Sequence, residues 1–112
     1  MENRRENKRE FYRLRYPTNC RPTLILLGKS YEVIDVCEKG VKFLLEKYRE
    51  FRPGRNIRFT ITFHDDSLDL EGEILRVEER TAVIYLKKPI PLGRIIEEQR
   101  YVRDMYPDYF QT

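Results

Sequence analysis

Alternating apolar and polar residues predict a series of short β-strands between Thr23 and Lys88. The segment TLILLGKSYEVIDV has two apolar runs around Gly28-Lys29, which predicts a hairpin with a type II′ turn because glycine would take its first central position. In GVKFLLE every second residue is apolar and is predicted to point inward: Val41, Phe43 and Leu45. The segment NIRFTITFH alternates in the same way, with its inward positions at Ile57, Phe59, Ile61 and Phe63.

Two further strands are predicted in LDLEGEILRV and TAVIYLKK, joined through residues 78–80. The apolar alternation of the first slips between Leu70 and Leu75, so we predict that Gly72 marks a β-bulge. Six short strands within about 65 residues are typical of a small closed or nearly closed barrel.

Both ends of the chain depart from the strand pattern. Beyond Pro91, apolar and amide residues recur at helical spacing, at Leu92, Ile95, Ile96, Gln99, Val102 and Tyr106. They predict an amphipathic helix over about residues 91–106 that packs on the barrel. Residues 1–17 lack any periodicity and are predicted to form a flexible basic arm. We therefore expect an all-β fold over residues 18–112, a six-stranded antiparallel β-barrel with a C-terminal α-helix.

The distribution of charge is uneven mainly in the N-terminal arm. The 112-residue chain has 22 Lys and Arg against 19 Asp and Glu, a net charge of +3 that is too mild to indicate bulk nucleic-acid binding. Between residues 4 and 21 the only acidic residues are Glu6 and Glu10, whereas the basic ones are Arg4, Arg5, Lys8, Arg9, Arg13, Arg15 and Arg21. A charge run of this kind is most often a solvated surface.

The sequence offers few groups for catalysis, metal binding or membrane insertion. His64 is the only histidine, and Cys20 and Cys37 form no CxxC pair, so neither a zinc site nor a Cys–His nucleophile is predicted. No glycine-rich phosphate loop is present, and no apolar run approaches the roughly 20 residues of a membrane span. We expect a cytoplasmic protein with reduced thiols that is not an enzyme and carries no cofactor or metal.

Two short motifs remain as candidate chemistry. KREFYR spaces Arg9 and Arg13 four residues apart in the arm, and DVCEKG spaces Asp35, Cys37 and Gly40 at the end of the second predicted strand. Each residue has an ordinary structural interpretation: surface ion pairs for the arginines, a turn cap for the aspartate and a turn position for the glycine.

Taken together, the two motifs resemble those of the PilZ domain family. Arg9-x-x-x-Arg13 is similar to the family's RxxxR motif, and Asp35-x-Cys37-x-x-Gly40 is similar to its DxSxxG or NxSxxG motif. The resemblance also covers the strand order and the terminal helix. It implies a bacterial receptor for cyclic di-GMP in which these five residues bind the ligand, with Lys8 and Arg76 as further candidates.

The chemistry of cyclic di-GMP agrees with these residue types. Arginine pairs bidentately with phosphate oxygens or with guanine O6 and N7, and its face stacks on a purine. The two oxygens of Asp35 match the N1–H and N2–H₂ donors of guanine, and Gly40 allows a tight turn or close approach of the ligand.

Cys37 departs from the family pattern, which has serine at this position. We interpret the thiol as a serine replacement, neither a nucleophile nor a metal ligand. Because sulfur is a weak hydrogen-bond partner, the substitution is expected to cost up to about tenfold in affinity.

The sequence therefore predicts a receptor in which cyclic di-GMP orders the arm and the signal passes to an unidentified effector protein. Two alternatives stay open. One is a ligand-independent PilZ-like interaction module for a pilus, flagellar or signalling partner. The other is a single-strand nucleic-acid-binding barrel, which is disfavoured because Phe43, Phe59 and Phe63 point inward and leave no evident stacking platform.

Overall fold

Alternation between buried and exposed positions builds the strands of this protein. The computed structural model describes residues 13–48 and 50–109. Its strands are β1 (Leu14–Arg15), β2 (Thr23–Leu26), β3 (Lys29–Cys37), β4 (Gly40–Leu44), β5 (Asn56–Thr62), β6 (Ser67–Val77) and β7 (Thr81–Leu86). A 3-10 turn, η2 (Thr18–Cys20), follows β1, and the helix α1 (Leu92–Met105) follows β7. Residues 1–12, with most of the predicted arm, lie outside the described residues.

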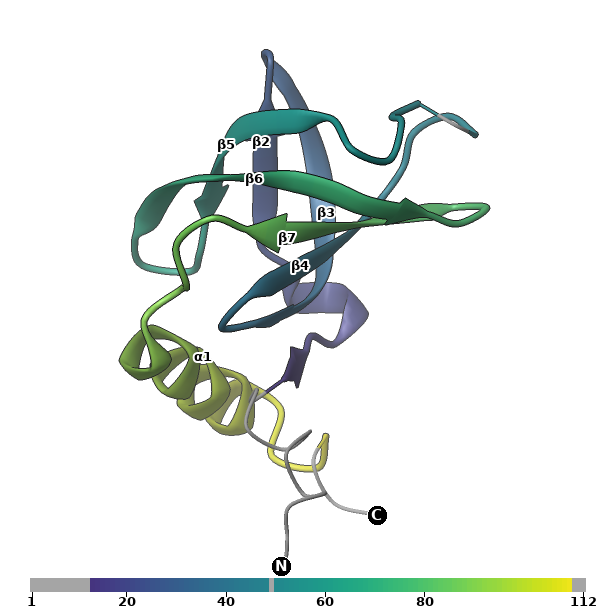
Figure 1. Cartoon of the computed structure of the whole chain (residues 1–112). Helices are drawn as coiled ribbons and strands as arrows, with labels where there is room; N and C mark the ends of the chain where they lie inside the picture. Colours follow the sequence, from purple (N-terminus) through teal and green to yellow (C-terminus); the bar gives the residue numbers. More distant parts are fainter. Residues whose placement is uncertain (1–12, 49, 110–112) are drawn as a thin grey trace, which may run out of the picture.

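Six of the strands close into an antiparallel barrel (Figure 1). They follow the order β3-β2-β5-β6-β7-β4, and β4 pairs back with β3 to complete the ring. The predicted six-stranded barrel with a C-terminal helix is thus confirmed. Strand β1 is an addition that pairs with β3, Leu14 opposite Val36 and Arg15 opposite Asp35. The sequence had assigned these two β1 residues to the arm.

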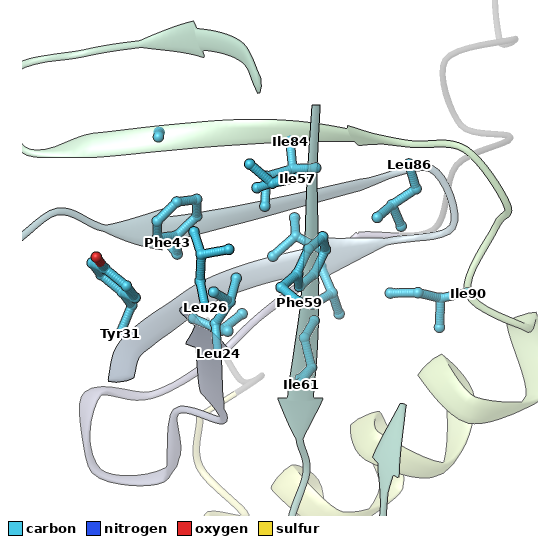
Figure 2. Close-up of a cluster of buried hydrophobic side chains, with 14 of the residues drawn as sticks. Leu24, Leu26, Tyr31, Phe43, Ile57, Phe59, Ile61, Ile84, Leu86 and Ile90 are labelled. Carbon is cyan, nitrogen blue, oxygen red and sulfur yellow. The ribbon is translucent and has the colours of Figure 1, made fainter. Parts of the chain in front are cut away.

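Inward residues of every strand fill the barrel interior. Figure 2 shows those of β2, β3, β4, β5 and β7. The predicted inward set is confirmed, since each member is at most 5% exposed: Val41, Phe43, Leu45, Ile57, Phe59, Ile61 and Phe63. Tyr31, Phe43 and Phe51 pack edge to face, with ring centroids 5.4–5.9 Å apart. This continuous core fixes the strand register and hence the side chains that face outward.

The β2–β3 turn is of a different type from the one predicted. Leu26 pairs with Lys29, so the two central residues are Leu27 and Gly28. Both have positive φ, 52° and 80°, which is the type I′ pattern. The sequence prediction of a type II′ turn at Gly28-Lys29 was therefore wrong by one residue, because the register of the two strands outweighed the local glycine preference.

The β6 bulge lies at Leu75 and not at Gly72, where the sequence predicted it. The register to β7 shifts between Ile74 and Arg76. Glycine is needed at position 72 for another reason, since a Cβ there would lie 2.4 Å from the carbonyl oxygen of Tyr85. The bulge reverses the alternation of β6, so that Ile74 is buried and Arg76 faces outward.

A second bulge, at Ile34, reverses the alternation of inward and outward side chains in β3. Val33 lies opposite the buried Phe43, and the next pairing joins Asp35 to Lys42. Without the extra residue, regular alternation from Val33 would turn the Asp35 side chain into the core. The bulge instead places it on the outer face of the barrel.

The helix α1 lies across the end of the barrel opposite to the β2–β3 turn (Figure 1). Its buried side chains are Ile95, Glu98 and Val102. Two residues predicted for the packing stripe, Leu92 and Ile96, are 44% and 40% exposed, so that part of the prediction was wrong. No helix in the described part of the chain is long and apolar enough to cross a lipid bilayer.

Candidate functional site

Two rows of outward side chains cross the barrel on the strands β3, β4, β7 and β6. Strand pairing sets the first row as Asp35, Lys42, Val83 and Arg76. The second row consists of Cys37, Gly40, Tyr85 and Glu73. The bulges at Ile34 and Leu75 bring Asp35 and Arg76 into the same row, although two strands, β4 and β7, lie between them in the barrel wall.

Strand β1 extends both rows toward the arm. Arg15 lies opposite Asp35 and Leu14 opposite Val36, and continuing this register by one residue sets Arg13 opposite Cys37. Arg13, the described residue of the arm motif, is therefore adjacent to the β3 motif because of two paired residues in β1. This explains how segments more than 20 residues apart in the sequence come to share one site.

A pocket of about 340 Å³ lies over these rows. Its lining includes every predicted site residue that the structure describes: Arg13, Asp35, Cys37, Gly40 and Arg76. Lys8 and Arg9, the other two predicted site residues, lie outside the described residues. Pockets for small ligands generally measure about 300–1,000 Å³, so this one is of suitable size.

Several residues of the pocket were not predicted from the sequence. Its lining also contains Lys39, Lys42, Leu75 and Tyr85. Lys42 and Tyr85 are the polar or amphipathic positions between inward residues of their strands, so alternation alone could have identified them as outward-facing. Lys39 Nζ lies 5.6 Å from the centre of the Tyr85 ring. The lining thus contains four basic side chains, Arg13, Lys39, Lys42 and Arg76, together with the carboxylate of Asp35.

The electrostatics of Asp35 are unusual for an aspartate. The residue is only 8% exposed, and burial raises the pKa of its carboxyl above the ordinary value. The positive charges that act against this shift are those of Arg13, Lys42, Arg15 and Arg76. Among the residues that the structure describes, none donates a hydrogen bond to this carboxylate. Asp35 lines the pocket, and the described residues leave its acceptor capacity unused.

Cys37 and Gly40 pair at the β3–β4 turn, next to Asp35. Cys37 is a free thiol of intermediate exposure, and it is not part of the core cluster. A Cβ on Gly40 would lie 3.5 Å from Cys37 Sγ and 3.4 Å from the Ile84 carbonyl oxygen. The backbone at Gly40 does not require glycine for its φ angle. An added methyl group would thus be tolerated by the fold but would project beside the pocket-lining thiol.

A second polar cluster lies where α1 meets the β5–β6 turn. Glu98 is 1% exposed and accepts a hydrogen bond of 2.8 Å from Tyr16 Oη. Its other oxygen lies 2.6 Å from His64 Nδ1 and 3.7 Å from a guanidinium nitrogen of Arg94. These contacts join the residue after β1 to the helix.

The sequence predicts no metal site, and this cluster is the one group of described residues with donors suited to a metal ion. The donor atoms of His64, Asp65 and Glu98 lie within 4.8 Å of one another. However, Nδ1 of His64 faces Glu98 whereas Nε2 faces Asp65, at 2.6 and 3.6 Å. Arg94 also donates to Asp65 at 2.8 Å. These contacts of His64, Asp65, Glu98 and Arg94 join the helix α1 to the β5–β6 turn.

Comparisons with known proteins agree with the barrel fold. The family model for the PilZ domain matches residues 3–103. Among solved structures, the PilZ domain of YcgR from Escherichia coli, determined with c-di-GMP, is similar with a TM-score of 0.74 and 13% identity. The match covers 89% of this chain and 98% of that one.

Two further solved structures share the fold. An uncharacterized Legionella protein is similar with a TM-score of 0.61 and 17% identity, over 86% of this chain and 98% of that one. The inhibitor of motility MotI/DgrA of Bacillus subtilis has a TM-score of 0.58 and 15% identity, over 96% of this chain and 57% of that one. A search of curated proteins found no match. At these identities the structural likenesses establish the fold alone.

Proposed function

The chain belongs to the PilZ domain family, and on that premise we propose that it is a bacterial receptor for cyclic di-GMP. The observation that carries the proposal is the convergence of Arg13, Asp35, Cys37, Gly40 and Arg76 around one pocket. Binding of c-di-GMP by the similar PilZ domain of YcgR supports the same ligand here. The proposed activity is binding and not catalysis, and it requires no cofactor or metal.

The charges of the pocket match the parts of this ligand. The two phosphates would interact with the basic side chains, since arginine donates two parallel hydrogen bonds to a phosphate and lysine supplies a point charge. A guanine edge would donate N1–H and N2–H₂ to the carboxylate of Asp35, which has no donor among the described residues. These donors would stabilise the ionised carboxylate and offset the cost of its burial.

The position of β1 indicates how binding would order the arm. Leu14 is 1% exposed and pairs with β3, so it anchors the chain beside the pocket. Arg13 directly precedes Leu14 in the sequence, and Arg9 lies four residues before Arg13. A ligand held by both arginines would draw residues 9–13 over the pocket. Such a ligand favours the ordered arm because it interacts with that state alone.

We further propose that the ordered arm presents a new surface to a partner protein in the cytoplasm. The similarity in fold to a protein named as an inhibitor of motility, MotI/DgrA, agrees with a regulatory role. In this proposal the signal passes to an unidentified effector protein. An interaction module that does not bind nucleotide is the principal alternative.

The test is a titration with two ligands at two salt concentrations. We expect saturable binding of cyclic di-GMP at micromolar concentration or below, and much weaker, strongly salt-dependent binding of a single-stranded oligonucleotide. The burial of Phe43, Phe59 and Phe63 removes those rings as a stacking platform for single strands. Preferential binding of the oligonucleotide would favour the nucleic-acid alternative, and binding of neither would favour the interaction module.

A further inference from the structure

Glu78 lies at the start of the β6–β7 turn, two residues after Arg76. The hydroxyl of Thr81 donates a 2.9 Å hydrogen bond to Oε1 of Glu78, and the Glu78 backbone N–H donates to the Thr81 carbonyl oxygen at 2.8 Å. The hydrogen bonds from Thr81 and Arg76, followed by the charge of Lys42, lower the pKa of the Glu78 carboxyl. The turn therefore holds an ionised carboxylate in a defined place.

The same carboxylate contacts two cations of the pocket. Arg76 donates from Nε to Oε2 at 3.1 Å, and Lys42 Nζ lies 3.7 Å from Oε1. Both cations line the pocket beside Asp35, whereas Glu78 lines a separate hollow with Tyr48 and Phe51. The negative charge of Glu78 thus lies outside the pocket and pairs with Arg76 and Lys42, which line it.

This position gives Glu78 influence over an anionic ligand. A phosphate in the pocket would compete with the carboxylate for Arg76 Nε and for the ammonium of Lys42. The carboxylate would also reduce the positive potential that attracts the ligand. Because the Thr81 hydroxyl and the turn fix Glu78, its charge would not simply move away when the ligand arrives.

We propose that Glu78 is an internal counter-ion of Lys42 and Arg76 that lowers the affinity of the pocket for a nucleotide with two phosphates. This inference rests on the proposed function, since it concerns the same pocket. It assigns Glu78 a positioning role through the two cations and no contact with the ligand.

The experiment compares Glu78→Gln with Glu79→Gln by calorimetric titration of cyclic di-GMP. Both substitutions remove one charge from the same turn, but Glu79 forms no ion pair with a described residue. We expect Glu78→Gln to raise the affinity about three- to tenfold, the range of two exposed ion pairs, and Glu79→Gln to change it less than about twofold. Glutamine keeps an acceptor for Thr81, and Glu78→Ala provides a second variant if the melting temperature falls.

Two further measurements identify the cause. The gain should shrink at about 0.5 M salt, because exposed charges are screened there. It should also vanish in a Lys42→Gln, Arg76→Gln background, as a double-mutant cycle requires for a direct interaction.

The failures of the two proposals are distinguishable. Wild-type binding with an equal effect of Glu78→Gln and Glu79→Gln would overturn the counter-ion and leave the receptor intact. Absence of binding by the wild type and every variant at about 100 µM ligand would overturn both.

Discussion

Asp35 carries the largest conflict between burial and charge in the pocket. Burial raises the pKa of its carboxyl, so folding favours the protonated form. The linkage has a definite sign: stability falls as the pH rises from the ordinary aspartate pKa through the raised folded value. A ligand that donates hydrogen bonds to the ionised form acts in the opposite direction.

We therefore expect Asp35→Asn to remove the contribution of this carboxyl to the pH dependence of folding stability and of ligand affinity. Relative to this variant, the wild type should lose stability as the pH rises through the acid range. Wild-type affinity for cyclic di-GMP should weaken by up to about tenfold per pH unit below the raised pKa, because a proton must be released on binding. Thermal melts and titrations of both proteins across this range provide the measurement. Parallel profiles would show that Asp35 is not coupled to the ligand.

Cys37 is expected to act as a poor substitute for serine. Its thiol lines the pocket and lies outside the core cluster, so Cys37→Ser should leave the melting temperature nearly unchanged. A better hydrogen-bonding oxygen should leave affinity unchanged or raise it by up to about tenfold. Cys20→Ser is the matched control, because Cys20 packs against the core and burial raises its pKa. If Cys37→Ser melted as low as Cys20→Ser and bound no better, the serine-replacement interpretation would be wrong.

At the scale of elements, the β2–β3 hairpin contains a strained residue at its tip. Leu27 has a φ of 52° and is 81% exposed, so it occupies the left-handed region without any packing in return. This conformation costs a leucine about 1–2 kcal/mol, whereas asparagine tolerates it. Leu27→Asn should raise the free energy of unfolding by about 1 kcal/mol in a urea titration. The same change at Leu75, an exposed leucine with negative φ, should give no gain; equal effects would exclude strain as the cause.

The helix depends on a buried hydrogen bond to the segment that follows β1. Tyr16 is 3% exposed and donates to the buried Glu98, a bond to a charged acceptor. Tyr16→Phe should lower the free energy of unfolding by about 1.5–3 kcal/mol. Tyr109→Phe is the control, since its hydroxyl donates to the Arg15 carbonyl oxygen at an exposed position. Chemical unfolding of both variants measures the difference, and a Tyr16 variant as stable as the control would contradict this role.

On the scale of the whole molecule, the sequence was most informative in strands where buried and exposed side chains alternate without interruption. Strands with regular alternation, such as the segment from Ile57 to Phe63, could be assigned with their inward faces. The same alternation could not locate the bulges. Ile34 and Val36 are apolar on both sides of Asp35, so the sequence does not say which of the three faces outward; pairing with β4 decides it.

The site was predictable as a set of residues and not as an arrangement. Motif spacing indicated Arg13, Asp35, Cys37 and Gly40, and the structure brings them to one pocket, while their role in binding stays a prediction. Glu98 could not be predicted as buried, because a glutamate in an amphipathic helix is expected to be exposed. Its partners Tyr16 and His64 come from distant segments of the sequence. Residues far apart in the sequence determine both the arrangement of the pocket and the burial of Glu98.

Calorimetric titration of cyclic di-GMP into the wild type, Arg13→Ala and Arg4→Ala tests the central claim most directly. We predict micromolar or tighter binding by the wild type and a loss of about 1.5–3 kcal/mol for Arg13→Ala, which removes a charge-assisted fork from the pocket. Arg4 lies outside both motifs, so Arg4→Ala should bind almost as the wild type does. No heat at about 100 µM ligand, or equal losses in the two variants, would contradict the assignment of this pocket to the nucleotide.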